Sequence, residues 1–272
     1  MKTKSQNHKI SIIGAGNLGI AIAEGLVSKK LNEPGEVYLT RRKLEFIKHM
    51  EDQGYQVTSD NISAVENSKI VFLCVQPSQL DKVLKGFSHV LTDDHILVSV
   101  ITGVSIEQIK SSLAKNIAVI RAMPNTAIAI GQSMTCICAC DKGKAHIEEV
   151  QKLFETVGKT LLIEEGLMKS ATVLGASGIA FFMRYLRAAT QGGIQMGFHP
   201  EEAQMIAAQT AFGAASLIQE FDNHPEVEID KVTTPRGCTI SGLNEMEHSG
   251  FSSALIKGLM VSFNRINGIQ DN

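Results

Sequence analysis

The sequence predicts an α/β protein in which a mainly parallel N-terminal sheet, covered by helices on both faces, is followed by an all-helical C-terminal unit. Three observations predict this class. Short apolar runs alternate with helical patterns up to residue 163, a glycine-rich turn joins the first run to the first helical pattern, and no clear strand-like run follows Gly166. With 272 residues, the chain is long enough for two units.

The first unit takes its strands from seven runs. Several are apolar at successive positions, which is typical of strands buried on both faces of a parallel sheet. The runs are residues 10–13, 37–39, 70–75, 96–100, 117–122, 133–139 and 160–163. We therefore place a first domain at residues 1–165 and a second at residues 166–272.

The second domain shows long helical patterns at residues 171–189, 200–220 and 251–266. The first of these is apolar on nearly all sides, so we expect other helices to enclose it, and a unit this small needs a second chain for that. Arg184 and Arg187 interrupt the pattern and argue against a membrane span.

Charge and cysteine content indicate which partners, which location and which metal sites to expect. Lys and Arg number 26 against 28 for Asp and Glu, a net charge of −2 that argues against a nucleic-acid or membrane-surface partner. The first apolar run is too short for a signal or transmembrane segment, so we expect a cytoplasmic protein. Five cysteines without an export signal predict reduced thiols, and Cys136, Cys138 and Cys140 alternate along one strand face as buried residues, not in zinc-ligand spacing. No metal site is expected.

A glycine motif lies at the turn between the first strand and the first helix. It reads Gly14-Ala15-Gly16-Asn17-Leu18-Gly19. Gly14 permits a tight turn, Gly16 allows a pyrophosphate to approach the backbone, and Gly19 allows the helix to pack closely on the strand. N–H groups at the helix start attract the anion. The motif predicts a Rossmann-type dinucleotide site; the alternative is a turn of structural use only.

The second strand ends in Thr40-Arg41-Arg42, where an NAD-binding chain would place an acid. A guanidinium makes bidentate hydrogen bonds to phosphate, so these residues predict NADPH as the preferred cofactor, with NADH as the second choice. The alternative is a solvated pair of arginines that opens the next helix.

Further cofactor contacts are expected where later strands end, because open α/β sheets bind ligands at the carboxyl ends of their strands. The candidates are Val75, Gln76 and Pro77 after one strand, Thr102 after the next, and Asn125 after a third. The Asn125 amide suits the nicotinamide carboxamide or ribose, but Pro-Asn is equally a common turn signal.

Six segments together resemble the successive motifs of pyrroline-5-carboxylate reductases, in order and over essentially the whole chain. The most specific are Arg-x-Met-Pro-Asn-Thr and the late Val-Thr-Thr-Pro-x-Gly-x-Thr. The six segments are residues 14–19, 75–77, 99–104, 121–126, 176–181 and 232–243.

This resemblance implies NAD(P)H-dependent reduction of the cyclic imine 1-pyrroline-5-carboxylate to L-proline. It further implies a homodimer with interlocked helical domains and active sites near the dimer interface; larger rings of dimers occur in the family. Thr239 would touch the substrate at the imine nitrogen, and Gly237-Cys238-Thr239 suit a helix N-terminus that binds a carboxylate. Ser177 would line the same pocket or only cap local backbone.

The sequence departs from the family pattern near the expected substrate. Gln76, Ala127, Ile179 and Arg236 replace the usual lysine, proline, proline and glycine. Arg236 would strain the loop if the position needs a positive φ, yet it could also contact an acidic substrate or point to solvent. Two alternatives therefore remain open: a reductase of a related imine or keto acid, and a catalytically weak cofactor-binding regulatory paralogue.

Overall fold

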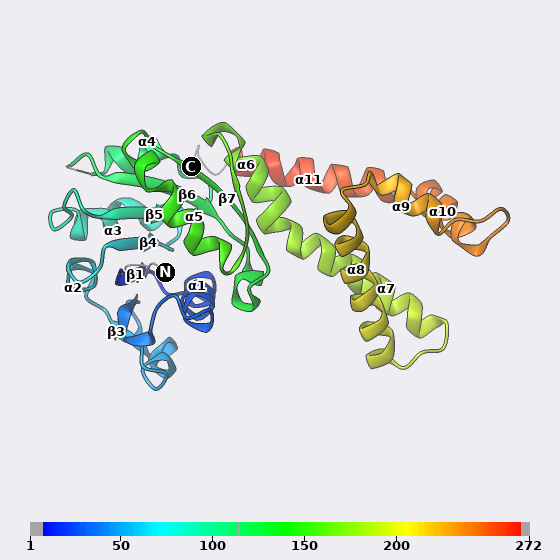
Figure 1. Ribbon diagram of the computed structural model, residues 1–272, viewed down its shortest axis with the longest axis horizontal. Helices are drawn as coiled ribbons and strands as arrows, with labels where there is room; N and C mark the ends of the chain where they lie inside the picture. Colours follow the sequence, from blue (N-terminus) through cyan, green and yellow to red (C-terminus); the bar gives the residue numbers. More distant parts are fainter. Residues whose placement is uncertain (1–7, 114, 268–272) are drawn as a thin grey trace, which may run out of the picture. The chain divides into compact units, whose positions relative to one another are not determined.

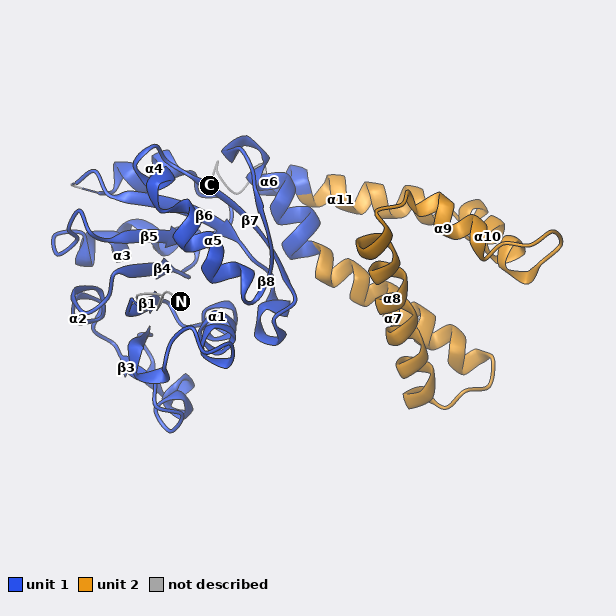
Figure 2. Cartoon of the chain, viewed as in Figure 1, with its two compact units in different colours: residues 1–177, 263–272 blue, residues 178–262 orange. Residues whose placement is uncertain are grey.

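The computed structural model describes residues 8–113 and 115–267. These form two compact units (Figure 2): a sheet unit, up to Ser177 and from Phe263 onward, and a helical unit, Gly178–Ser262. The sequence-predicted boundary at 165/166 lies a short distance before this division and stays a prediction.

The sheet unit contains a single eight-stranded sheet in the order β3-β2-β1-β4-β5-β6-β7-β8 (Figure 1). Neighbouring strands are parallel except β6 and β7. The strands are β1 Ile10–Ile13, β2 Val37–Thr40, β3 Gln56–Thr58, β4 Ile70–Leu73, β5 Ile96–Ser99, β6 Ala118–Met123, β7 Ser133–Ala139 and β8 Gly158–Leu162. The mainly parallel sheet is thus confirmed, with β3 as a strand that the sequence analysis missed.

Helices cover both faces of this sheet. One core packs Ile22 of α1 and Phe154 of α5 against the strands, and the other packs Val65 of α2, Leu84 of α3 and Ile109 of α4. The helices are α1 Asn17–Ser28, α2 Asn61–Glu66, α3 Leu80–Phe87, α4 Ile106–Ser111, α5 Ile147–Glu155 and α6 Met168–Ala171. Short 3-10 turns are η1 Pro34–Glu36, η2 Leu44–Phe46, η3 Lys48–Met50, η4 Pro77–Gln79, η5 Thr126–Ile130, η6 Lys142–His146 and η7 Glu165–Leu167. Strands buried on both faces explain the continuous apolar runs.

The rest of the described chain is helical after β8. Its remaining helices are α7 Gly178–Gln195, α8 Pro200–Phe221, α9 Pro225–Lys231, α10 Cys238–His248 and α11 Phe251–Asn267. The expected helix at 171–189 is divided: α6 leads into a π-helical segment, Thr172–Ser177, and α7 follows it. Helix α9 was not predicted.

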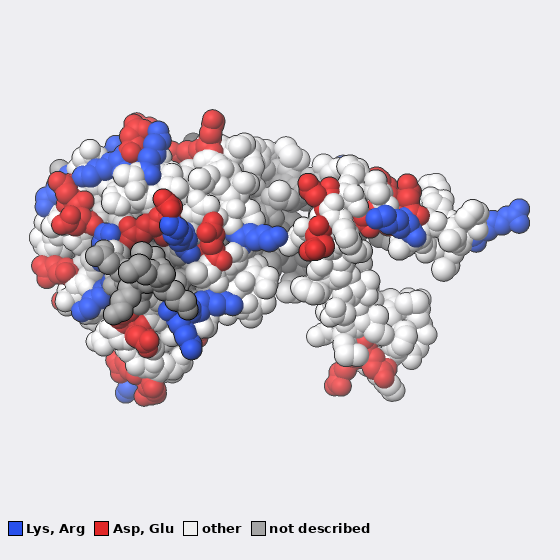
Figure 3. Space-filling view, viewed as in Figure 1, with Lys and Arg blue, Asp and Glu red and all other residues white. Residues whose placement is uncertain are grey.

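The helical unit leaves much of its apolar surface uncovered within one chain. Phe182, Met205 and Phe212 are 70%, 67% and 64% exposed. Figure 3 shows wide uncharged areas over this unit, whereas acidic and basic side chains alternate over the sheet unit. Such surface needs a partner in water, as the sequence analysis expected.

Among the described residues, the helical stretch Glu165–Gln195 is long and apolar enough to cross a membrane by length and composition alone. A helix enclosed in the core of a soluble protein passes the same test.

The three cysteines at and directly after β7 are buried, as expected, whereas Cys238 is exposed. Cys136, Cys138 and Cys140 are each less than 9% exposed. Burial raises the pKa of the Cys138 thiol to about 11, and burial likewise raises that of Cys74 to about 12. These thiols are therefore neutral at physiological pH.

Candidate functional site

The three motif glycines differ in what surrounds them. At Gly14, with φ +96°, an added Cβ would lie 2.6 Å from a Val75 methyl and 2.9 Å from the Cys74 carbonyl oxygen. At Gly19 it would lie 2.9 Å from an Ile12 methyl, but at Gly16 it would meet no atom of residues 8–113 and 115–267 within 4 Å. Gly14 and Gly19 are thus required by the protein itself. Gly16 leaves open space above the backbone, as the approach of a pyrophosphate requires.

Helix α1 begins at this open position. Gly16 is its N-cap, Asn17 and Leu18 start its first turn, and no side chain caps it. N–H groups of a first helical turn have no partner inside the helix, and the helix dipole favours negative charge there. The start of α1 therefore fits a phosphate group.

A cleft of about 890 Å3 opens over the glycine turn at the carboxyl ends of β1, β2 and β4. It brings together seven of the residues predicted to bind the cofactor: Gly14, Gly16, Thr40, Arg41, Arg42, Val75 and Gln76. Lys43, Phe46, Asn61 and Lys82 line it as well, and none of the described lining residues is an acid. A cleft of this size, whose charged lining residues are all basic among those described, suits an anionic nucleotide.

Thr40 and Arg41 hold the glycine turn in place. Thr40 is 1% exposed, and its carbonyl accepts the Gly14 and Ala15 N–H groups at 3.2 and 2.8 Å. The Arg41 guanidinium donates to the Ala15 carbonyl at 3.2 Å and lies 4.7 Å from the centre of the Phe46 ring. Thr40 thus supports the glycine turn through its backbone carbonyl, whereas the side chain of Arg42 is exposed at the edge of the cleft.

Six predicted cofactor residues do not line the cleft. Asn17, Leu18 and Gly19 lie in the first turn of α1, and the other three follow the ends of strands. Pro77 opens η4, and Thr102 follows β5. Asn125 is buried: its Oδ1 accepts from the Ala127 N–H at 3.0 Å, and its Nδ2 donates to the Gly175 carbonyl at 3.1 Å. These two bonds fit the turn role of Asn125, and its contact with the cofactor stays a prediction.

An ion pair near this edge of the sheet escaped the sequence analysis. Arg121 on β6 is 5% exposed, and its Nη1 lies 3.0 Å from Glu165 Oε1 in η7. The same oxygen accepts the N–H of Ile106, the first residue of α4, at 2.6 Å. Glu165 therefore ties β6 and α4 to the segment that leads into the π-helix.

The residues predicted to bind substrate occur in both units. Ser177 ends the π-helical segment of the sheet unit, and such segments often mark functional sites. In the helical unit, Gly237 caps α10, and Cys238 and Thr239 form its first turn, with Thr239 exposed. The expected helix start at this position is confirmed.

Arg236 has the positive φ, +62°, that the sequence analysis identified as costly. It occupies the third position of a turn in which the Gly237 N–H donates to the Thr234 carbonyl at 2.9 Å. With Pro235 second and a positive φ third, this is the pattern of a type II turn, which favours glycine where Arg236 stands. Arg236 is exposed.

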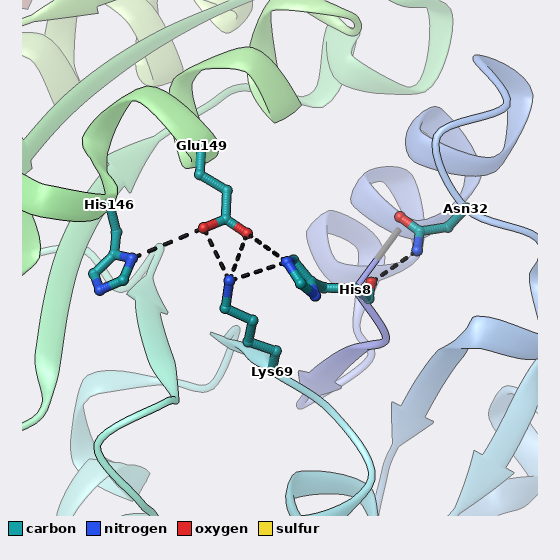
Figure 4. Close-up of polar contacts among 5 residues, drawn as sticks. All are labelled: His8, Asn32, Lys69, His146 and Glu149. Atoms are coloured by element: carbon teal, nitrogen blue, oxygen red, sulfur yellow. Dashed lines mark hydrogen bonds and ion pairs between the residues drawn. The ribbon is translucent and has the colours of Figure 1, made fainter. Parts of the chain in front are cut away.

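A polar cluster occupies the opposite, amino-terminal edge of the strands (Figure 4). Lys69 Nζ contacts both carboxylate oxygens of Glu149 at 3.1 and 3.2 Å and donates to His8 Nε2 at 3.0 Å, while His146 lies 3.8 Å from the same carboxylate. These contacts join the segments before β1 and β4 to α5. The cluster lies at the opposite end of these strands from the cleft.

Comparisons with known proteins agree with this geometry. The model for pyrroline-5-carboxylate reductase dimerisation matches residues 165–269, and that for NADP oxidoreductase, coenzyme F420-dependent, matches residues 9–103. Pyrroline-5-carboxylate reductase 2 of Dictyostelium discoideum is 44% identical over 272 residues, covering 94% of this chain and 91% of the relative. Reductase 1 of the same organism is 49% identical over 95% of this chain, which spans only about half (49%) of that relative.

Solved structures share the fold over nearly the whole chain. The pyrroline carboxylate reductase of Plasmodium falciparum, with NADP bound, superposes with a TM-score of 0.88 at 19% identity, covering 97% of this chain and 99% of the other. The pyrroline-5-carboxylate reductase of Coxiella burnetii gives 0.86 at 26% identity, with coverage of 97% and 98%.

Proposed function

This chain belongs to the pyrroline-5-carboxylate reductase family, and from that premise we propose that it reduces 1-pyrroline-5-carboxylate to L-proline with a hydride from NAD(P)H. The observation that carries the proposal is the 44% identity to a reductase that the chain matches over 91% of that relative's length. The open glycine turn and the acid-free cleft of the sheet unit supply a matching nucleotide site. No observation favours either alternative function.

The reaction requires little acid–base catalysis from the protein. The nicotinamide supplies the hydride, and the iminium carbon of the substrate is already electrophilic, so the protein chiefly binds and orients the two reactants. Gly14, Gly16 and the start of α1 would hold the pyrophosphate. We assign the substrate carboxylate to the first turn of α10, at Gly237 and Cys238, and the imine nitrogen to the Thr239 hydroxyl, with Ser177 as a further contact.

The helical unit carries the family's dimerisation segment, so the uncovered apolar residues of α7 and α8 are assigned to a homodimer interface. Association of these dimers into a larger ring, and a cytoplasmic location, stay predictions from the resemblance and the composition.

The reaction is tested by following NADPH oxidation at 340 nm with purified protein and pyrroline-5-carboxylate, and by identifying the product by chromatography. We expect stoichiometric L-proline. Binding of NADPH without proline formation would overturn the proposed substrate. The protein would then be either a reductase of a related imine or keto acid, or a cofactor-binding regulatory paralogue.

We propose that the cofactor is NADPH in preference to NADH, because Arg41 and Arg42 line the cleft where an acid would otherwise bind the ribose hydroxyls. Replacing both arginines by alanine should raise the Kd for NADPH about tenfold or more and that for NADH much less, since each lost charge-assisted bond costs roughly 1.5–3 kcal/mol. Calorimetric titration with each cofactor measures this. Equal losses for both would remove the phosphate assignment.

Two variants at Arg236 separate backbone strain from substrate contact. Arg236→Gly should raise the free energy of unfolding by roughly 1 kcal/mol, because glycine adopts φ +62° without steric cost. Arg236→Ala removes the guanidinium but keeps the strain. If the guanidinium contacts the substrate carboxylate, both variants raise KM for pyrroline-5-carboxylate severalfold. Urea unfolding and steady-state kinetics distinguish the effects, and a KM unchanged in both variants would assign Arg236 to solvent.

A further inference from the structure

Cations line the nucleotide cleft from two separate elements. The segment after β2 contributes Arg41, Arg42 and Lys43, and α3 contributes Lys82. The other polar residues that η4 and α3 place along the cleft, Gln76, Ser78 and Gln79, are uncharged. Lys82 is thus the single charge on that wall, among the described lining residues.

Arg41 is already oriented by its own chain. Its guanidinium donates to the Ala15 carbonyl at 3.2 Å and stacks on Phe46 at 4.7 Å, and Lys43 Nζ lies 6.0 Å from the same ring. These contacts fix Arg41 and attract Lys43 to the aromatic face. Both cations are thereby partly engaged by protein groups.

Arg42 and Lys82 are not engaged in this way. Both side chains are exposed, and within residues 8–113 and 115–267 neither side chain forms an ion pair or a hydrogen bond. The neighbouring acid Asp81 accepts from the Ser112 hydroxyl at 2.7 Å and does not line the cleft. Two free cations therefore face one cleft from two different elements.

We propose that Lys82 binds the 2′-phosphate of the adenosine ribose, so that α3 is a second determinant of cofactor choice beside the arginines after β2. This rests on the proposed function. The pyrophosphate already has N–H donors at the glycine turn and the start of α1, whereas the extra phosphate of NADPH has no backbone donor set of this kind. A lysine supplies a point charge to it from the far wall without the geometric demands of a guanidinium.

The chain offers a matched control. Lys85 lies one turn further along α3, is equally exposed, and does not line the cleft. We would compare Lys82→Met with Lys85→Met, and with Lys82→Arg as the conservative variant, by calorimetric titration with NADP+ and with NAD+. The ratio of the two Kd values is the measurement, because a general loss of folding or of net charge affects both ligands alike.

Lys82→Met should reduce the preference for NADP+ over NAD+ by roughly fivefold, Lys82→Arg should restore most of it, and Lys85→Met should leave the ratio unchanged. Competition by 2′-AMP should weaken in Lys82→Met, and competition by 5′-AMP should not. A ratio unchanged in Lys82→Met, or equal losses for the two dinucleotides, would overturn the proposal; equal losses would place Lys82 at the pyrophosphate.

Failure of this inference is distinguishable from failure of the proposed reaction. If the protein forms proline but Lys82→Met leaves the ratio of the NADP+ and NAD+ Kd values unchanged, only the role of Lys82 is overturned. If Lys82→Met changes that ratio but the protein forms no proline, only the proposed substrate is overturned.

Discussion

Gly16→Ala should raise the Kd for NADP+ at least tenfold while changing the free energy of unfolding of the cofactor-free protein by less than about 1 kcal/mol. The added methyl meets no atom of the described residues within 4 Å, and the backbone there, with φ −93°, suits alanine. Since the described residues leave this space open, the methyl would obstruct a ligand that approaches the turn. Titration calorimetry and urea unfolding on the same preparation measure the two quantities.

Gly14→Ala is the matched control, since it lies in the same turn but should act on stability. Its Cβ would lie 2.6 Å from Val75 and 2.9 Å from the Cys74 carbonyl oxygen, on a backbone with φ +96°. Strain and overlap together should cost at least 2 kcal/mol. If Gly16→Ala binds NADP+ like the parent protein, the pyrophosphate does not lie over Gly16, and the glycine turn is only structural.

Much of the sheet unit was predictable because its signals are local. The run at residues 70–73 is apolar at every position and forms β4, all of whose residues are buried, because burial on both faces favours apolar side chains at successive positions. Residues 10–13 and 133–139, which include buried serine and threonine, likewise form β1 and β7. The glycine motif was equally informative, because a different neighbour explains each glycine: the segment directly after strand β4 at Gly14, open space for a ligand at Gly16, and strand β1 at Gly19. The same reasoning predicted strain at Arg236 if the position needs a positive φ, and its φ is +62°.

Elements with weak local signals were missed. The three residues of β3 pair with β2 at the edge of the sheet and stay partly exposed, so no apolar run marks them. The π-helical segment 172–177 has the same apolar pattern as the α-helix around it, and only its hydrogen bonding distinguishes the two.

Pairings between distant residues were also beyond the sequence. Arg121 and Glu165 are 44 residues apart, and their contact depends on how η7 passes the end of β6. Asn125 shows the same dependence. Its Nδ2 donates to the Gly175 carbonyl, 50 residues later, a contact that the sequence does not reveal. Reasoning from spacing alone treats such a side chain as free.

The substrate assignment depends most on Thr239. Thr239→Ala should lower kcat roughly 10- to 100-fold, because a hydrogen bond to a charged or developing-charge group contributes about 1.5–3 kcal/mol. Thr239 is exposed in the first turn of α10, whose N-cap, Gly237, offers no side chain, so the hydroxyl is available to a ligand. Thr239→Ser keeps the hydroxyl and should retain most of the turnover.

The Kd for NADP+ separates a substrate role from a general disturbance of the site. It should change less than about twofold in Thr239→Ala, since the nucleotide contacts are assigned to the glycine turn and the cations of the sheet unit. A parallel loss of NADP+ binding would mean that the alanine acts through the fold. Unchanged kcat and KM would instead remove Thr239 from the site and leave the backbone N–H groups of α10 as the substrate contact, because those groups are kept in every variant at this position.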